Sequence, residues 1–436
     1  MANEPIQIGL LGLGTVGSGV ANVLLEKATQ LEVTIGRRLK LNKVLIRDQS
    51  KPRNVRLPEG TLTTDPNDIV GNPDIDVVVE LLGGIDPARS LMETALHQGK
   101  HLVTANKEVM AYHGAQLLGL AADKRRDLFF EASVGGGIPL IGPFRQNLAA
   151  NEITEIHAII NGTTNYILSK MSQTKTDLRT ALGNAQELGF AEPDPTNDID
   201  GHDAAYKIAI LATLAFGTPV LPEDVEREGI GLLSPIDFSY AAELGYAIKL
   251  LGVARLRGQG IEVGVYPTLL TDDFLISQVH GVDNAVRIKG DLLGRALFVG
   301  KGAGPKPTAS AIIADLIDLA HNIKVGAHAR VPVRFDLGRK VLAEDQLRSR
   351  YYLRLWVSDQ PGVLAQIAQV FADAGASIAA VTQKETDPDA RTAELVILSH
   401  ETNCGAMRTA VHKLAELDST ERVASVLRVE DLEDDE

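Results

Sequence analysis

The 436-residue chain carries 43 Lys and Arg against 57 Asp and Glu, a formal net charge of −14. A chain this acidic lacks the basic surface that binds nucleic acid or anionic membranes, so we expect neither as a partner. Its single cysteine, Cys404, excludes an intrachain disulfide framework. The first residues carry no signal-peptide charge, and no apolar run reaches the roughly 18 residues of a membrane span. We expect a cytoplasmic protein of about two to four domains that binds small molecules.

The chain begins with a pattern typical of a phosphate-binding turn. From Ile6 it reads IQIGLLGLGTVGSGVANVLLEKA, an apolar stretch followed by glycines in G-x-G-x-x-G spacing and an amphipathic stretch. This order predicts a strand, a tight turn and a helix whose free N–H groups bind a dinucleotide pyrophosphate, although a glycine-rich turn without a ligand would look the same. The turn residues that we expect to bind the cofactor are Gly12, Leu13, Gly14, Thr15, Val16 and Gly17.

Apolar strand patterns then alternate with helical ones as far as about residue 145. This alternation predicts a doubly wound parallel sheet of the Rossmann type, which binds ligands beyond the carboxyl ends of its strands. The second expected strand ends in Arg47 and then Asp48. An acidic residue there favours NAD and a basic residue favours the 2′-phosphate of NADP. Because Lys51 and Arg53 follow, we expect NADP, with NAD possible.

A row of acids leads to one lysine between Gly189 and Lys207. Asp200, Asp203 and Lys207 have the spacing i, i+3, i+7, which places them on one face of an expected helix. An Asp203–Lys207 salt bridge on a solvated face is one interpretation. The apolar continuation instead favours a buried helix whose charged first turn opens into a cavity. A lysine there could act as a general acid or base, and the carboxylates could hold an ammonium group.

The same stretch resembles a family signature. AQELGFAEPDPTNDIDGHDAAYK follows throughout the pattern A-x3-G-F-[AS]-x2-D-P-x2-D-[IL]-x-G-x-D-x3-K of homoserine dehydrogenases. Segments such as VTANK, EASVGGGIP, NGTTNYIL and GKGAGPKPTASAIIADL are also similar to this family, over about residues 5–330. The resemblance implies NADP(H)-dependent interconversion of L-aspartate 4-semialdehyde and L-homoserine. It also implies a homodimer or homotetramer.

The resemblance also implies site residues. Lys207 would be the general acid/base, with Lys107 assisting at the reacting oxygen. Further implied residues are Glu192, Asp203 and Asp198 for the substrate, Thr104, Lys107, Gly189 and Gly302 for the cofactor beside Arg47, and Glu131, Val134, Gly136 and Ile138 for a structural Na+ or K+. The ion would be held by the Glu131 side chain and by main-chain oxygens of the other three. Without the resemblance, the glycine-rich segments could be flexible loops.

The C-terminal part changes pattern near Tyr351. Its expected order is β-α-β-β-α-β, the ferredoxin-like arrangement. With the turn before its first helix it resembles an ACT domain, a regulatory amino-acid-binding module. Threonine is the expected effector, bound by Asp359, Gly362 and Val363. A plain dimerisation module is the alternative.

The expected domains are therefore a nucleotide domain, a mixed α+β substrate and dimerisation domain, a linker, the ACT domain and an acidic tail. Their ranges are 1–145, to which we expect 305–330 to return, then 146–304, 331–349, 350–430 and 431–436. Two other functions stay open: another NAD(P)-dependent amino-acid dehydrogenase, and a non-catalytic amino-acid sensor. The intact pair of lysines argues against the sensor, which needs no acid/base.

Overall fold

The chain divides into two compact units in the computed structural model, which describes residues 4–53, 55–328, 333, 335, 338–387 and 391–431. Unit 1 comprises Met1–Glu155, Tyr206–Glu223 and Arg287–Gly338, and unit 2 comprises Ile156–Ala205, Asp224–Val286 and Arg339–Glu436. The expected acidic tail after residue 431 and part of the expected linker lie outside the described residues. The expected domain boundaries stay a prediction.

Unit 1 contains a six-stranded parallel sheet in the order β3-β2-β1-β4-β5-β6. Its strands are β1 (Ile6–Leu11), β2 (Leu39–Leu45), β3 (Leu62–Thr63), β4 (Val77–Glu80), β5 (His101–Thr104) and β6 (Leu128–Phe129). The order reverses direction at β1 and β4, so the carboxyl ends of these two strands flank the crevice where such sheets bind dinucleotides. This arrangement confirms the predicted Rossmann-type sheet.

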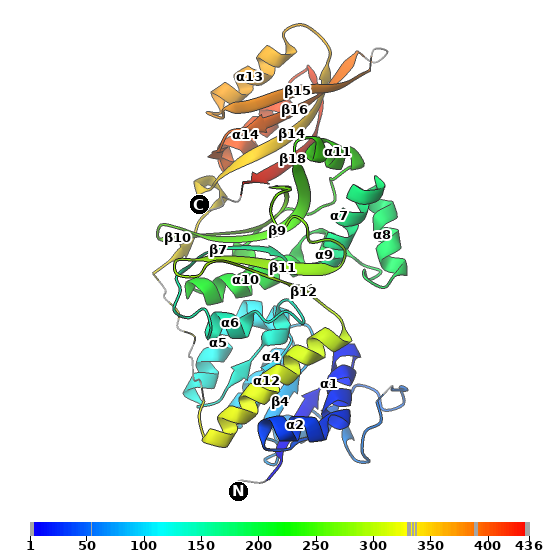
Figure 1. The fold of residues 1–436 in the computed structure, drawn as a ribbon, viewed down its shortest axis with the longest axis vertical. Helices are drawn as coiled ribbons and strands as arrows, with labels where there is room; N and C mark the ends of the chain where they lie inside the picture. Colours follow the sequence, from blue (N-terminus) through cyan, green and yellow to red (C-terminus); the bar gives the residue numbers. More distant parts are fainter. Residues whose placement is uncertain are drawn as a thin grey trace. The chain divides into compact units, whose positions relative to one another are not determined.

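Two helices far apart in the sequence pack together on this sheet (Figure 1). Helix α1 (Thr15–Glu26) follows the glycine turn, and helix α12 (Pro305–Val325) lies beside it. The helices approach closely because Gly19 has no side chain, and a Cβ atom there would lie 3.0 Å from the Pro305 carbonyl oxygen. Val20, Leu24, Ile312 and Leu316 join the sheet residues in one buried core.

The remaining elements of unit 1 are helices that flank the sheet or support its loops. They are α2 (Ala28–Ile35), α3 (Asn67–Val70), α4 (Ala88–His97), α5 (Lys107–Asp123), the 3-10 helix η1 (Glu131–Ser133), α6 (Ile141–Arg145) and most of α10 (His202–Phe216), with the strand β12 (Gly294–Lys301). Helix α10 is apolar and buried along Ile208–Ala212, which confirms the predicted buried helix.

Unit 2 is organised around a long antiparallel hairpin. Strands β9 (Tyr246–Arg257) and β10 (Gly260–Thr271) pair over their full length around Gly258, whose φ of +61° suits the two-residue turn between them. The main path of this twelve-stranded sheet follows the order β12, β11 (Asp283–Gly290), β7 (Ile153–Ile159), β9, β10, β18 (Thr420–Glu430), β14 (Arg348–Ser358), β16 (Thr392–Ser399) and β15 (Ile378–Asp387), and three short strands pair outside it. The elements beside the hairpin are β7 (Ile153–Ile159), α7 (Gly162–Thr174), α8 (Leu178–Glu187), α9 (Thr196–Ile199), η2 (Pro222–Asp224), β8 (Glu226–Arg227), α11 (Pro235–Glu243) and β11 (Asp283–Gly290).

The C-terminal module has the predicted β-α-β-β-α-β order. Its main elements are β14 (Arg348–Ser358), α13 (Val363–Asp373), β15 (Ile378–Asp387), β16 (Thr392–Ser399), α14 (Cys404–Ala415) and β18 (Thr420–Glu430), with the short β13 (Lys340–Val341), η3 (Glu344–Gln346) and β17 (Thr402–Asn403). Helices α13 and α14 pack on Leu353, Leu355 and Ile397 in one core. This confirms the ferredoxin-like fold.

The sheet of the module is continuous with the hairpin. Strand β18 pairs in parallel with β10, so that Thr268 lies opposite Arg428. On β14, the fully buried Arg354 donates hydrogen bonds to Asp237 of α11 (Nε to Oδ1, 2.7 Å) and to Glu394 of β16 (Nη1 to Oε1, 2.6 Å). The module and helix α11 therefore share a desolvated ion cluster.

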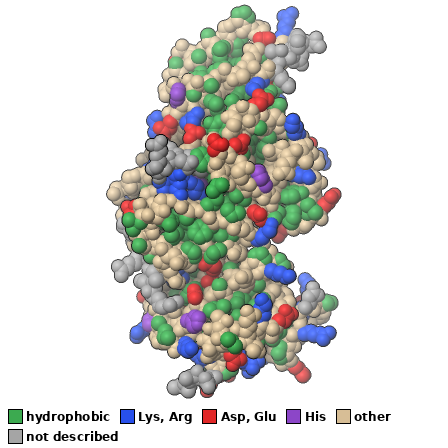
Figure 2. Space-filling view, viewed as in Figure 1, with side chains coloured by type: hydrophobic (Ala, Val, Ile, Leu, Met, Phe, Trp, Pro, Cys, Tyr) green, Lys and Arg blue, Asp and Glu red, His purple; other side chains and the backbone are tan. Residues whose placement is uncertain are grey.

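On the face in Figure 2, acidic and basic side chains are interspersed. Across the described residues, no helix combines the length and the apolar character needed to cross a bilayer.

Candidate active site

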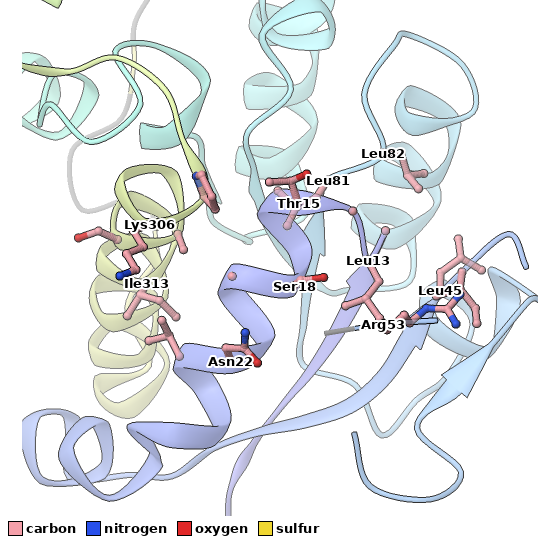
Figure 3. Close-up of a pocket in the computed structure, with 18 of the residues that line it drawn as sticks. Leu13, Thr15, Ser18, Asn22, Leu45, Arg53, Leu81, Leu82, Lys306 and Ile313 are labelled. Atoms are coloured by element: carbon pink, nitrogen blue, oxygen red, sulfur yellow. The ribbon is translucent and has the colours of Figure 1, made fainter. Parts of the chain in front are cut away.

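The glycine turn borders a cavity of about 1730 Å³ in unit 1. Gly12 has a φ of +104°, and Gly17 lies so close to Gly12 that a Cβ atom would be 2.2 Å from its carbonyl oxygen. A Cβ atom on Gly14 would instead meet no protein atom within 4 Å, since Gly14 faces open space. Leu13, Thr15 and other lining residues surround this space (Figure 3). The turn thus leaves room at Gly14 for the backbone to approach a ligand.

The loop after β2 carries both acidic and basic side chains, and they have different hydrogen-bond partners. The carboxylate of Asp48 accepts hydrogen bonds from the N–H (2.8 Å) and hydroxyl (2.7 Å) of Ser50, and these bonds lower the pKa of Asp48. Arg53 donates to the Lys51 carbonyl oxygen at 2.7 Å and so closes the same loop. Arg47 is exposed and lines the cavity. Asp48 is therefore hydrogen-bonded within its own loop, and it lines the cavity together with Arg47, Lys51 and Arg53.

A second cavity, of about 230 Å³, brings the two predicted lysines together. Lys107 and Lys207 both line it, with Gly136 and Gly302. Both lysines are half-buried. They reach this cavity from elements that are 100 residues apart in the chain, the start of α5 and the middle of α10. The cavity can therefore bring two ammonium groups to one small ligand.

Buried polar side chains fix the position of Lys107. Asn106 caps helix α5: its Oδ1 accepts from the Val109 N–H (3.1 Å) and its Nδ2 donates to the Gly84 carbonyl oxygen (2.7 Å). Thr104, predicted as a cofactor residue, is buried and donates to the Glu80 carboxylate at 2.6 Å. Burial raises the pKa of Glu80, despite its hydrogen bonds. Lys107 thus begins a helix whose first turn cannot shift freely.

The predicted substrate carboxylates meet at one residue that the sequence analysis did not single out. Nδ2 of Asn161, the N-cap of α7, donates to Oδ1 of Asp198 (2.6 Å) and to Oδ2 of Asp203 (2.9 Å). Asp203 is 5% exposed. Glu192 is exposed, and its carbonyl oxygen accepts from Gln186. The structure therefore groups two of the three predicted acids.

Glu131, predicted as an ion ligand, has main-chain partners. Its Oε1 accepts from the N–H groups of Leu140 and Ile141, and its Oε2 from that of Gly142 at 2.6 Å. These bonds cap helix α6, while burial raises the pKa of Glu131. Three N–H donors leave about one lone-pair position of a carboxylate for another partner. The described residues include no group of three or more His, Cys, Asp or Glu side chains suited to a metal ion.

The glycine-rich loops near Glu131 are held by close contact and are therefore ordered. Gly136 has a φ of +56°, and a Cβ atom there would lie 2.4 Å from the Gly302 carbonyl oxygen. The N–H of Ile138 donates to the Gly135 carbonyl oxygen at 2.9 Å. Gly136 tolerates no side chain at this contact, so the loops GGG and GKGAG can meet there.

The predicted regulatory residues lie at the start of α13. Asp359 follows β14, is exposed, and its N–H donates to the Arg391 carbonyl oxygen. Gly362 is the N-cap of α13 with a φ of +95°, whereas the side chain of Val363 is buried in the module core. The main-chain N–H groups of the first turn, rather than the Val363 side chain, are the ligand donors available here.

A glycine-rich nucleotide fold, a cavity lined by two lysines and a ferredoxin-like module together define a nicotinamide-dependent oxidoreductase with a regulatory module. Family comparison is consistent with this class. The sequence model described as "Homoserine dehydrogenase, NAD binding domain" matches residues 12–131, "Homoserine dehydrogenase" matches 139–317, and "ACT domain" matches 351–417. The chain belongs to the homoserine dehydrogenase family.

Relatives over the full length agree. Homoserine dehydrogenase of Neisseria gonorrhoeae is 43% identical over 99% of this chain and 100% of that protein, and that of Bacillus subtilis is 40% identical over 98% and 99%. A homoserine dehydrogenase crystal structure from Thiobacillus denitrificans has a TM-score of 0.91 at 43% identity, covering 98% of this chain and 99% of that one.

Another solved relative is a hyperthermophilic archaeal homoserine dehydrogenase in complex with NADPH, with a TM-score of 0.62 and 31% identity over 72% of this chain and 97% of that one. The comparisons together identify an NAD(P)-dependent oxidoreductase that acts on homoserine and carries an ACT regulatory domain. They confirm the predicted family and activity over the two alternatives.

Proposed function

We propose that Lys207 is the general acid/base of this homoserine dehydrogenase and that Lys107 stabilises the reacting oxygen. The observation that carries this proposal is that both lysines line one 230 Å³ cavity with Gly302. Two ammonium groups in a small, partly desolvated space stabilise an oxygen on which negative charge develops. The cavity lies next to the glycine loops, so the nicotinamide end of the cofactor is assigned there.

The proposed reaction needs few protein groups. When bound, the dinucleotide supplies the hydride in one direction and accepts it in the other. Lys207 donates a proton to the aldehyde oxygen of L-aspartate 4-semialdehyde as that oxygen becomes an alkoxide, which gives L-homoserine. In the reverse direction neutral Lys207 removes the hydroxyl proton. Asp203, Asp198 and Glu192 hold the substrate ammonium, which fixes the orientation of the substrate.

A spectrophotometric assay tests this proposal. Purified protein with L-homoserine and NADP or NAD should change nicotinamide absorbance, whereas L-serine, one methylene shorter, should react far more slowly. With the ammonium held by the carboxylates, the shorter hydroxyl would fall short of the lysines, and a misplaced reacting group loses about 100-fold or more. Equal rates for the two amino acids would contradict the proposed clamp.

We infer that NADP is the preferred cofactor, because Arg47, Lys51 and Arg53 line the cavity and the carboxylate of the neighbouring Asp48 is hydrogen-bonded within its own loop. A guanidinium binds a 2′-phosphate that only NADP carries. Arg47→Ala is therefore expected to raise the KM for NADP about tenfold or more and to change that for NAD by less than about twofold, as charged hydrogen bonds contribute roughly 1.5–3 kcal/mol. Initial rates with each cofactor measure this, and equal losses would assign Arg47 to adenine packing.

We propose that a structural Na+ or K+ binds near Glu131. The residues that would hold it are Glu131 through its remaining lone pair and Val134, Gly136 and Ile138 through main-chain oxygens, which are hard donors suited to such ions. Burial supports this assignment, because a cation would favour the ionised form of a carboxylate that is only 8% exposed. The ion would fix the glycine loop against Gly302.

We also infer a homodimer or homotetramer. Strand β12 ends the order of its sheet, and Leu292 and Val299 near it are 72% and 51% exposed. An exposed edge with apolar side chains is suited to contact with a second copy.

A cytoplasmic location stays a prediction.

We propose that threonine binds the ACT domain and inhibits the enzyme. The free N–H groups at the start of α13 suit an amino-acid carboxylate, and the exposed Asp359 suits its ammonium. Inhibition requires that threonine bind two states of the enzyme unequally, with a coupling of about 1–3 kcal/mol.

Asp359→Ala is expected to raise the threonine concentration for half inhibition about tenfold or more and to leave uninhibited kcat near wild type, because Asp359 lies in the module. Threonine titration of the rate measures this, with Asp373→Ala on the same module as the control. An intact enzyme that ignores millimolar threonine and shows no calorimetric heat would reassign the module to another ligand or to subunit contacts.

A further inference from the structure

We propose that Asn161 is a positioning residue for the substrate carboxylates: its amide holds Asp198 and Asp203 at the separation that receives an ammonium group. This inference rests on the clamp proposed above, and it assigns the geometry of the clamp to a neutral side chain. Asn161 lies between the end of β7 and the start of α7, while Asp198 belongs to α9 and Asp203 to α10. One amide therefore joins three helices.

The orientation of the Asn161 amide follows from its hydrogen bonds. Its Oδ1 accepts from the N–H of Thr164 (2.8 Å) and from the hydroxyl of Thr164 (3.0 Å) in the first turn of α7. Nδ2 must then face the acids. The reversed amide would place an oxygen 2.6 Å and 2.9 Å from two carboxylate oxygens and would remove both bonds to Thr164. The amide NH2 has two hydrogens, which is one for each carboxylate.

The amide itself has little freedom to move. Asn161 is 6% exposed, and the next residue, Gly162, packs so that a Cβ atom would lie 2.8 Å from the Val282 carbonyl oxygen. A site held by the end of a strand and the start of a helix is more precise than one on a loop. The position of Asn161 is therefore set by the backbone, and the carboxylates adjust to it.

The electrostatics explain why a neutral donor suits this place. Two carboxylates that share a site repel, and the repulsion favours protonation of one of them. A lysine or arginine at position 161 would end the repulsion but would compete with the substrate for the same anions. An amide donates one hydrogen bond to each acid and adds no net charge. The pair of acids therefore keeps the negative charge that attracts an ammonium.

Serine at position 161 separates this role from helix capping. Asn161→Ser keeps a good N-cap for the Thr164 N–H, because serine and asparagine rank about equally at that position, but it removes both N–H donors. We expect the KM for homoserine to rise about tenfold or more, since bonds to charged groups are lost. The kcat and the KM for NADP should stay near wild type.

Asn403→Ser is the matched control. Asn403 caps α14 in the ACT module through the Ala406 N–H (3.0 Å), so the same exchange tests capping alone. It should leave the KM for homoserine unchanged. A wild-type KM in Asn161→Ser would overturn the proposal and leave Asn161 as a helix cap.

A double-mutant cycle covers the case in which Asn161→Ser perturbs folding. In an Asp203→Asn background, Asn161→Ser should raise the KM little further, because the two residues act as one unit. Additive losses would refute the shared role. If Asp203→Asn alone leaves the KM unchanged, the clamp itself is wrong. If Asp203→Asn raises the KM while Asn161→Ser does not, the clamp holds and only the role of Asn161 fails.

Discussion

Replacing Lys207 by alanine is expected to lower kcat for homoserine oxidation by about 100- to 10,000-fold, the range for loss of general acid/base catalysis. Lys207 lines the small cavity with Lys107 and is half-buried on α10, so the cavity keeps its other walls. NADP binding and the melting temperature should change little. Steady-state rates, cofactor titration and thermal unfolding measure the three quantities. Lys413→Ala, an exposed lysine on α14, serves as the control.

A second substitution at this position separates proton transfer from charge. Lys207→Arg keeps the positive charge, but a guanidinium does not release a proton in a protein. The arginine variant should therefore be nearly as slow as the alanine variant. Recovery of most of kcat by arginine would show that Lys207 acts only as a fixed charge, and near-normal kcat in the alanine variant would remove it from the mechanism.

The second large effect is expected at Asp203. Asp203→Ala should raise the KM for homoserine at least about tenfold, because removal of one partner from a buried charged hydrogen bond costs roughly 2–5 kcal/mol. Asp203 is 5% exposed and bound to Asn161, so solvent screens it weakly. The KM for NADP should stay near wild type. Kinetics with homoserine varied at saturating NADP measure the effect.

Asp200→Ala is the control for Asp203, since Asp200 is exposed and lies only three residues earlier in the same row of acids. It should leave both KM values unchanged. A variant Asp203→Ala with a lower melting temperature and an unchanged KM would make Asp203 a structural partner within the Asn161 cluster and nothing more.

Local patterns allowed the nucleotide turn to be predicted in detail. The requirement for glycine at positions 12 and 17 follows from backbone geometry within a few residues, and the structure places the Gly17 Cα against the Gly12 carbonyl oxygen. The ferredoxin-like order was predictable for the same reason, because hydrophobic periodicity specifies each of its strands and helices. Local patterns did not predict that Lys107 and Lys207 lie close together. That expectation came from the family resemblance.

Long-range contacts could not be predicted from spacing. Asn161 meets its two acids across 37 and 42 residues, and Arg354 meets Asp237 across 117. The N-cap pattern of Asn161 before a helix was a usable signal for capping, but no signal connected it to the acids. The hydrogen bonds of Glu131 could not be predicted either, because the residues next to it in the sequence do not indicate that its carboxylate accepts from N–H groups of α6.

The pairing of β18 with β10 makes the C-terminal module an integral part of unit 2. A chain cut before β14 would leave the edge of β10 that faces β18, at Thr268–Leu270, unpaired and would leave Asp237, which has no exposed surface, without the guanidinium of Arg354. Truncation would thus damage the part of the enzyme that carries the substrate acids. Variants that lose the proposed threonine inhibition should therefore be sought as single substitutions such as Asp359→Ala, which keep the pairing of β18 with β10 intact.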